Sequence, residues 1–488
     1  MSDKTLSTEE KALAINLDVN KYGTFAEIGA GQEVVRHFFQ AGATAGTVAK
    51  SMSAYDMLFS DSIYGKCDRY VSKQRLLQML EHEYALVEER LTESRGEKST
   101  FFAFANTVAA QSFRGGRECH GWMGIRFQLS PMSKPCDIIL HVRMLDAQNL
   151  QQQDALGIIG VNLVHGAFFH RDHPRDFIRA LGDNLGTGRI EVDMIQFLGE
   201  GFDCIDNRIL SLLLVMEGLT KVSLFNANGE VVMPAEHMYK KPILVERGSF
   251  QPVNNVHIDM LECARKEFCK LQDVADDKVC VLFELNLAAI DGSGELDLMD
   301  FLYRVDTITA LGHNVLVSNY VEYYRIGSYL RKWTEKPIGI VLGLSNLADI
   351  FNSSYYENLD GGILEAFGRL FKQNVVLYVY PMTLENFEKY RSIRNLPEDM
   401  RVSLESIQGH AVITANSYRP EEHLKSLYQY VMDHGFIESL ENFQPDCLDL
   451  FSRDTLAKIL AHDKEWEKDV PPEVAVIIKE RKLWGYED

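Results

Sequence analysis

The sequence predicts an α/β protein with two Rossmann-like domains, mostly parallel sheets and a helical C-terminal tail. Three observations lead to this fold class. At 488 residues the chain exceeds the roughly 250–300 residues that one hydrophobic core supports. Apolar runs alternate with amphipathic segments in both halves of the chain, as in β-α-β units. The last residues are charged and helical in pattern, with Pro471-Pro472 before a final helix. We therefore expect domains over 1–250 and 251–440 and a tail over 441–488.

The first domain is expected to be organised around residues 156–250. The apolar run Leu156–Val164 is predicted to be a buried strand, followed by a His-rich loop at residues 165–176. A β-α-β-α-β succession then continues to residue 225 through further apolar runs. Other segments predicted as strands are Phe101–Asn106, Trp122–Phe127 and Asp137–Leu145.

The second domain repeats the alternation more plainly. Runs of Val, Ile and Leu without polar alternation indicate strands that are covered on both faces, hence a parallel sheet. The predicted strands are Val279–Asn286, Asn314–Asn319, Pro337–Leu342, Val375–Tyr380 and Ala411–Thr414, and the predicted helices are Leu298–Leu311, Glu322–Trp333 and Ile363–Phe371.

Composition excludes several classes of protein. The chain has 50 basic and 70 acidic residues, a net charge of −20, so its surface repels a phosphate backbone and nucleic acid is not an expected partner. No apolar run reaches the length of a membrane helix, and the polar N-terminus does not resemble a secretory signal. Eight scattered cysteines without a C-x-x-C pair are typical of free thiols in a reducing compartment, so we expect a cytoplasmic protein with no membrane partner.

A glycine turn near residue 30 is the first candidate binding element. Gly29 and Gly31 lie between a predicted strand and a predicted helix, where they allow close backbone approach to an anion. Gln32 and Glu33 follow, and Lys50 lies in a small-residue segment downstream. The pattern Glu-x-Gly-x-Gly is similar to the first motif of nucleotide and S-adenosylmethionine binders, although the third glycine is missing. A turn that needs glycine only for its geometry explains the pattern equally well.

The His-rich loop is the best candidate for catalysis. It contains Gly166, Phe168, His170 and His173, the residue types of the Gly-x-Phe-x-x-x-His-x-Gly-His motif, and so it resembles the adenylyl-transferring nucleotidyltransferases. In those enzymes histidines stabilise the charge on the transferring phosphate. Here the two histidines are three residues apart, as in the motif, but Gly-x-Phe lies two residues closer and no glycine precedes His173. A solvated turn that caps the next helix is the alternative.

Carboxylates and basic residues complete the candidate site. Glu191 and Asp193 alternate along a predicted strand and so share one face, where they could hold Mg²⁺; Asp193 is also a candidate catalytic residue. Lys241 and Arg247 flank a later strand and could bind phosphate. Charges at the rim of a sheet and ordinary surface cations remain the alternatives.

The chain as a whole resembles one bacterial family over nearly its full length. The recognisable stretches are Tyr22–Glu33, Lys50–Asp56 and Tyr239–Phe250. Members of that family are often labelled nicotinate-nucleotide adenylyltransferase or TonB-dependent receptor. The receptor label conflicts with the lack of a signal-like N-terminus and of a series of alternating strands. The transferase label implies ATP or another nucleotide with Mg²⁺ as ligand.

Three functions remain open. We favour an enzyme, a nucleotide-using transferase whose glycine turn and His-rich loop line one cleft. A metal-dependent enzyme of another class would use Glu191, Asp193 and the histidines instead. A self-assembling structural or scaffold protein on an enzyme-like fold is the third, because a fold does not dictate a function; it would form a homo-oligomer.

Overall fold

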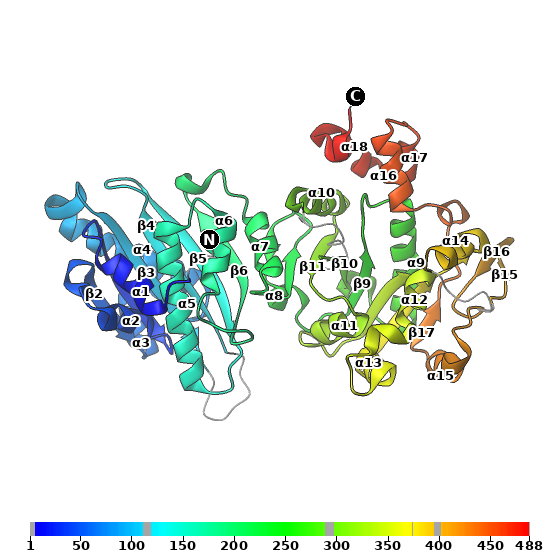
Figure 1. Cartoon of the computed structure of the whole chain (residues 1–488), viewed down its shortest axis with the longest axis horizontal. Helices are drawn as coiled ribbons and strands as arrows, with labels where there is room; N and C mark the ends of the chain where they lie inside the picture. The colour runs from blue at the N-terminus through cyan, green and yellow to red at the C-terminus, as the bar shows by residue number, and fades with distance from the viewer. Residues whose placement is uncertain (1–4, 111–118, 288–296, 373, 395–401, 488) are drawn as a thin grey trace. The chain divides into compact units, whose positions relative to one another are not determined.

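The chain folds into two compact α/β units. The computed structural model describes residues 5–110, 119–287, 297–372, 374–394 and 402–487 (Figure 1). The units are Met1–Lys221 and Val222–Asp488. The α/β class and the multi-domain organisation predicted from the sequence are confirmed. The division lies before residue 222 rather than at 250, because β7 (Val222–Phe225) and β9 (Ile243–Gly248) both belong to the sheet of the second unit.

The first unit is built on a six-stranded mixed sheet in the order β2-β1-β3-β4-β5-β6. β1 pairs in parallel with both of its neighbours, whereas β3, β4, β5 and β6 form an antiparallel succession. The strands are β1 (Lys21–Gly29), β2 (Val48–Ala54), β3 (Thr100–Ala109), β4 (His120–Gln128), β5 (Pro135–Met144) and β6 (Ile190–Leu198). The parallel pairing that we expected to predominate is limited in this sheet to β2, β1 and β3.

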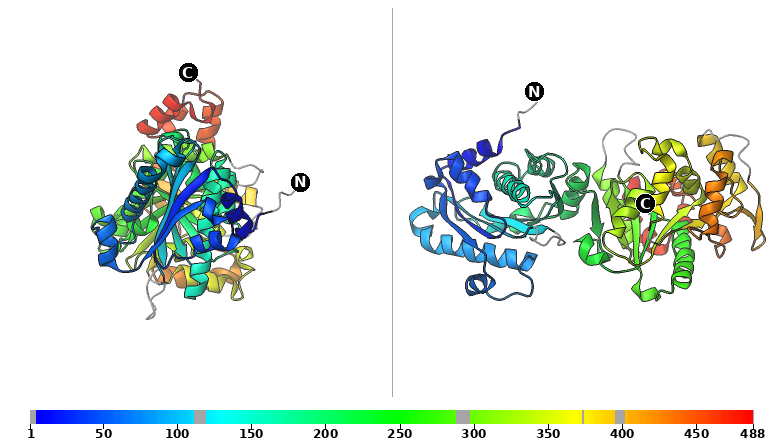
Figure 2. Two further views of the ribbon diagram at one scale, coloured as in Figure 1. Left: turned by 90° about the vertical axis from the view of Figure 1, so that its left-hand side faces the viewer. Right: turned by 90° about the horizontal axis from the view of Figure 1, so that it is seen from below.

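Helices cover both faces of this sheet. α4 packs against β1, β3 and β4 on one face, and α5 packs against β4 and β5 on the other (Figure 2, right). α1 and α2 contact α5 and so lie on its side of the sheet. The helices of this unit are α1 (Thr8–Asn16), α2 (Val34–Ala41), α3 (Met57–Tyr64), α4 (Lys73–Leu91), α5 (Asn149–Phe169), α6 (Pro174–Leu181) and α7 (Asn207–Met216).

The predicted central strand Leu156–Val164 is wrong. These residues form the middle of the 21-residue helix α5, in which they are all buried. A continuous apolar run fits a buried helix as well as a buried strand, and periodicity cannot separate the two. The predicted β-α-β-α-β unit is therefore α5, α6, β6, α7 and β7, with β7 in the other unit.

The second unit has an eight-stranded sheet in the order β17-β13-β12-β9-β10-β11-β7-β8. The six strands from β17 to β11 are all parallel to their neighbours, and β7 and β8 add antiparallel strands at one edge. The bounds are β8 (Val231–Val232), β10 (Cys280–Asn286), β11 (Asn314–Ser318), β12 (Ile338–Gly343), β13 (Val375–Tyr380) and β17 (Ile437–Ser439). The strands predicted near 280, 315, 338 and 375 are confirmed.

The strand order of this sheet is that of the Rossmann fold. Numbered from β9 along the chain, the parallel strands have the spatial order 3-2-1-4-5-6. The order reverses between β9 and β12, which are neighbours in the sheet although they are separated in sequence. In open α/β sheets, ligands bind outside the carboxyl ends of the strands at such a reversal.

Helices cover both faces of the second sheet. α11 and α13 share one core cluster with β9 and β12, whereas α9 packs against the opposite face of β9, β12 and β13. The bounds are α8 (Pro234–Met238), α9 (Asn255–Gln272), α10 (Leu298–Thr309), α11 (Tyr323–Arg331), α12 (Leu344–Ile350), α13 (Gly362–Leu370), α14 (Leu384–Arg394) and α15 (Lys425–Asp433). A separate three-stranded sheet contains β14 (Met382–Thr383), β15 (Glu405–Ile407) and β16 (His410–Ile413).

The C-terminal segment packs onto the second unit, and it is helical as predicted. It contains α16 (Ser452–Leu460), α17 (Trp466–Asp469) and α18 (Pro472–Arg481). The indole of Trp484 donates a hydrogen bond to Asp300 at 2.7 Å, and α18 contacts α10. The segment therefore belongs to the second unit rather than forming a separate tail.

No helix in the described part of the chain combines the length and the apolar character needed to cross a membrane. The eight cysteines are all free.

Candidate functional site

A pocket of about 780 Å³ opens at the carboxyl ends of the parallel strands in the second unit. It is lined by residues at or just after the ends of β9, β10, β12 and β13, which places it at the reversal of strand order between β9 and β12. The N-terminal turn of α9 and the segment Leu448–Arg453 contribute further walls. The volume is within the range of about 300–1,000 Å³ that is usual for small-molecule sites.

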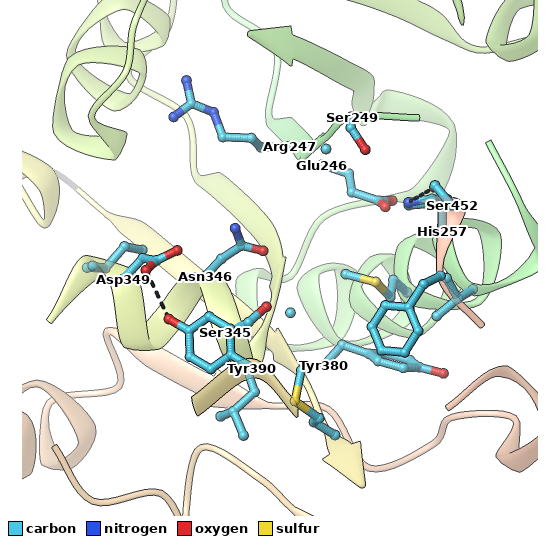
Figure 3. A pocket seen from close by; sticks show the side chains of 18 of the residues that line it. Glu246, Arg247, Ser249, His257, Ser345, Asn346, Asp349, Tyr380, Tyr390 and Ser452 are labelled. Atoms are coloured by element: carbon cyan, nitrogen blue, oxygen red, sulfur yellow. Dashed lines mark hydrogen bonds between the residues drawn. The ribbon is translucent and has the colours of Figure 1, made fainter. Parts of the chain in front are cut away.

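Aromatic and apolar side chains dominate the lining, with a few polar groups between them (Figure 3). The aromatic members are Tyr323, Tyr355, Tyr356, Tyr380, Tyr390 and Phe451. Ser249, Ser345 and Asn346 add short hydroxyl and amide groups. An apolar site with a small number of placed polar groups is typical of sites that hold an organic molecule in one orientation.

Arg247 lies at the end of β9 but is held by protein partners. Its guanidinium donates to both oxygens of Glu284, at 2.5 and 3.1 Å, and to the carbonyl of Val321 at 2.7 Å; it also contacts the carbonyl of Tyr320. The group lies 4.8 Å from the ring centroid of Tyr323. Arg247 was predicted to bind a phosphate, but its guanidinium already makes these four hydrogen bonds within the protein.

Glu246 lies one residue earlier on the same strand, and its side chain points to the opposite face of the sheet. It is 1% exposed, and neither of its carboxyl oxygens has a hydrogen-bond partner among the described residues. Burial raises the pKa of this carboxyl well above its ordinary value, so that the neutral acid is favoured. Glu246 is thus a residue of the pocket lining whose covered carboxyl group has no partner among the described residues.

His257, in the first turn of α9, is a half-buried ionisable group of the lining. Its Nδ1 accepts the backbone N–H of Asn254 at 3.1 Å, and its Nε2 lies 3.5 Å from the hydroxyl of Ser452 (Figure 3). Burial lowers the pKa of His257 to about 3, so the ring is uncharged near neutral pH. The Ser452 hydroxyl also donates to the carbonyl of Pro252 at 3.0 Å, which fastens the C-terminal segment to the start of α9.

Two tyrosines of the lining are fixed by carboxylates. Tyr390 donates to Asp349 at 2.9 Å (Figure 3), and Tyr380 donates to Asp259 at 2.5 Å. Asp259 also accepts the backbone N–H of Gln444 at 2.8 Å. These bonds hold the aromatic walls in place without a ligand.

The glycine turn of the first unit is filled by one of the protein's own carboxyl groups. Glu27 in β1 accepts the backbone N–H of Val34, at the start of α2, at 3.1 Å. The amide of Asn106 donates to the carbonyl of Gly31 at 2.8 Å, and a Cβ at Gly31 would lie 2.3 Å from the Asn106 side chain. The helix start that was predicted to face a ligand anion is therefore occupied, and Gly31 is required by close packing. Of these two glycines, Gly29 alone has the positive φ, +79°, that is expected of a turn glycine.

The other predicted binding residues of this region also have protein partners. Gln32 donates to the carbonyl of Gly29 at 3.3 Å, and Glu33 pairs with Arg36 at 3.0 Å. Lys50 lies on β2 and pairs at 2.5 Å with Glu83 of α4, a fully buried carboxylate.

The histidines lie at the other end of β1 from the glycine turn. His170 is the C-cap of α5 and His173 the N-cap of α6. The neighbouring rings of Phe168 and Phe169 pack within 5.2 and 5.1 Å of the ammonium group of Lys21, the first residue of β1. Gly29 is eight residues further along this strand, which is a rise of about 26 Å. The turn and the histidines therefore do not line one cleft, contrary to the prediction.

Asp193 and Glu191 are engaged in separate contacts. Asp193 lies at a bulge of β6, where it binds His141 and accepts from Arg143 at 2.7 Å. Burial opposes its ionisation, but His141 and Arg143 outweigh that effect and hold the pKa of Asp193 below its ordinary value. Glu191 accepts from the hydroxyl of Thr220 at 2.8 Å. Among the described residues, no group of three or more His, Cys, Asp or Glu side chains is arranged as a metal site.

The pocket at the reversal of strand order between β9 and β12, which we call the switch-point pocket, was not predicted from the sequence. Of the predicted site residues, only Arg247 lines it; Lys241 is exposed before the amino end of β9. One signal was available: Glu246 and Arg247 interrupt an otherwise apolar strand, and Gly248-Ser249 follows directly. Charged residues inside the carboxyl end of a buried parallel strand mark the ligand edge of such a sheet.

Comparison with known proteins gives little further information. No protein-family model matches the chain, and no curated protein matches it. Among solved structures, the chain is similar to the competence/damage inducible protein CihA from Agrobacterium tumefaciens, with 18% identity and a TM-score of 0.24 over 34% of this chain and 97% of that one. It is also similar to a CinA superfamily protein from Enterobacter cloacae, with 15% identity and a TM-score of 0.25 over 34% and 96%. Likeness at this level supports no inference about function.

Proposed function

We propose that the second unit binds a nucleoside or a nucleoside monophosphate in the switch-point pocket. The position of the pocket carries the proposal, because it lies at the carboxyl edge of a 3-2-1-4-5-6 sheet, where this fold holds nucleotides. The aromatic lining supports it further, since stacking of a base on an aromatic ring contributes about 1–3 kcal/mol.

The charges of the lining favour a ligand with few phosphates. Two arginines, Arg247 and Arg453, line the pocket, and Arg247 is occupied by Glu284 and backbone carbonyls. Stabilising a transferring triphosphate ordinarily needs several cationic groups and a metal ion. Binding of a base and sugar, with at most one phosphate near Arg453, agrees better with this lining than triphosphate chemistry does.

Thermal unfolding of the full chain with millimolar adenosine, AMP or nicotinamide mononucleotide tests the proposal. A ligand at 100 times its Kd is expected to stabilise the second unit by about 2.7 kcal/mol and so to raise its melting temperature. Release of pyrophosphate from ATP and nicotinate mononucleotide would extend the proposal to the adenylyl transfer that the family resemblance implies.

A filled pocket provides the control for specificity. Ser345 lines the pocket at the start of α12, so Ser345→Trp is expected to place an indole in the cavity and abolish the ligand-induced shift. Ser426 is exposed on α15 outside the pocket, and Ser426→Trp is expected to leave the shift unchanged. The proposal fails if no compound shifts the wild type, or if both variants respond alike.

A further inference from the structure

Glu246 and Glu284 are neighbouring carboxylates with opposite surroundings. They lie on the adjacent strands β9 and β10, and each is at most 1% exposed. Glu284 accepts from Arg247 and from the hydroxyl of Ser318 at 2.5 Å, so its charge is balanced. Glu246, on the other face, has no hydrogen-bond partner among the described residues. The fold thus satisfies one buried carboxyl group and leaves the other, which belongs to a residue of the pocket lining, without a partner among the described residues.

An unpartnered buried polar group is costly. A buried donor or acceptor without a partner destabilises a protein by about 1–3 kcal/mol, and native structures rarely keep one without a reason. An apolar side chain at this position of β9 would avoid the cost, and the next inward-facing residue on the same face, Leu244, is apolar. The pocket lining includes Glu246, so a bound molecule is the partner that the position allows.

The surroundings of Glu246 favour the uncharged form of its carboxyl group, because they bury it without a balancing charge. Arg247 on the same strand faces away and is paired with Glu284. On α9, which covers this face, His257 is neutral near pH 7, and Asp259 is engaged by Tyr380 and by the backbone of Gln444. Among the residues that the structure describes, no cation shifts this carboxyl group, and burial is the cause of its raised pKa. A neutral carboxyl group offers one O–H donor beside one C=O acceptor.

We propose that Glu246 recognises the ligand of the switch-point pocket by paired hydrogen bonds to an edge that presents an N–H donor beside an N or O acceptor. This inference rests on the proposed function and names the chemical class of its ligand. The amino edge of adenine has this pattern, and so does the carboxamide of nicotinamide. Purine riboside, which lacks the amino group, has the acceptor but not the donor.

Calorimetric titration of the full chain with adenosine, nicotinamide riboside and purine riboside separates the possible ligands. We expect adenosine or nicotinamide riboside to bind, according to which of them presents its edge to Glu246. If that edge belongs to adenine, purine riboside is expected to bind at least tenfold more weakly than adenosine. Equal binding of adenosine and purine riboside, with no binding of nicotinamide riboside, would overturn the inference.

Variants of Glu246 give a second readout. Glu246→Leu removes both hydrogen bonds, so affinity is expected to fall by about 10- to 100-fold, while the melting temperature of the free protein does not fall because an unpartnered group has been removed. Glu246→Gln keeps a donor beside an acceptor. As pH rises past the pKa of Glu246, wild-type affinity is expected to fall because the O–H donor is lost, whereas the Gln variant is expected to retain its affinity and so to exceed the wild type.

The outcomes separate the two proposals. If the wild type binds and Glu246→Leu binds equally well with the same dependence on pH, the role of Glu246 is overturned while the pocket remains the ligand site. If the wild type binds none of the three compounds, the proposed function itself falls, and the inference falls with it.

Discussion

At the scale of single residues, a buried carboxyl group governs the glycine turn of the first unit. Glu27 lies in β1 and binds the start of α2, which was expected to face a ligand anion. The sequence shows the glycines and the carboxylates of this turn, but not which carboxylate points inward. Glu33 was the carboxylate predicted to interact with a ligand, yet its partner is Arg36, and the helix amides are occupied by Glu27.

Glu27 also predicts how the stability of the first unit depends on pH. Burial raises its pKa from 4.5 to about 8. Between these values the folded state holds a proton that the unfolded state has released, so stability is present below about pH 4.5 and is lost as pH rises through about 8. The slope is on the order of 1 kcal/mol per pH unit.

Glu27→Gln keeps the acceptor for Val34 and removes the titration. Urea unfolding of the first unit at several pH values is expected to show a flatter profile for the variant than for the wild type over this range. Parallel profiles for the two proteins would show that Glu27 does not retain a proton on folding.

At the scale of elements, α5 shows where sequence patterns stop being informative. Its central residues are apolar on every side, because α1, α2 and α6 as well as the sheet pack around it. The helical period therefore disappears, and the run looks like a strand. Strands of the second unit were predicted closely, since short Val- and Ile-rich runs bounded by helical patterns leave less ambiguity.

The glycines of α5 indicate close helix packing, which the pattern of apolar residues does not. A Cβ at Gly160 would lie 2.3 Å from Val34 of α2, so the two helices approach each other through this glycine. Gly160→Ala is expected to destabilise the first unit by about 1–3 kcal/mol through overpacking, despite the higher helix propensity of alanine.

Gly368 of α13 provides a matched control, because a Cβ there would meet no atom within 4 Å. Gly368→Ala is expected to stabilise the second unit by about 0.5–1 kcal/mol. Denaturant midpoints of the two variants should therefore move in opposite directions. A stabilising Gly160→Ala would contradict the close packing of α2 and α5.

At the scale of the whole molecule, each unit has its own sheet and its own core. We expect 1–221 and 222–488 to fold when expressed separately, and the ligand-induced shift to occur in 222–488 alone. Circular dichroism and thermal unfolding of the two fragments check both points. A 222–488 fragment that folds cooperatively but does not bind the ligand of the full chain would place the site elsewhere.

The class of fold could be predicted from the sequence, but the location of the site could not. Alternating helices and strands identify α/β units, whereas strand order depends on long-range pairing such as that of β9 with β12. That pairing decides which loops meet. It places the pocket beside Glu246 and not beside His170 or Asp193. Residue types that suggest chemistry can serve packing instead: the ring of His165 lies against those of Phe169 and His170.

The pocket is finished by a segment far downstream of the strands that begin it. Ser452 reaches the carbonyl of Pro252 across 200 positions of sequence, and Leu448–Arg453 forms part of the wall. During synthesis the floor of the cavity emerges from the ribosome long before its last wall. A chain that has not been translated through α16 lacks this wall, so we expect the proposed ligand to bind weakly until the second unit is complete.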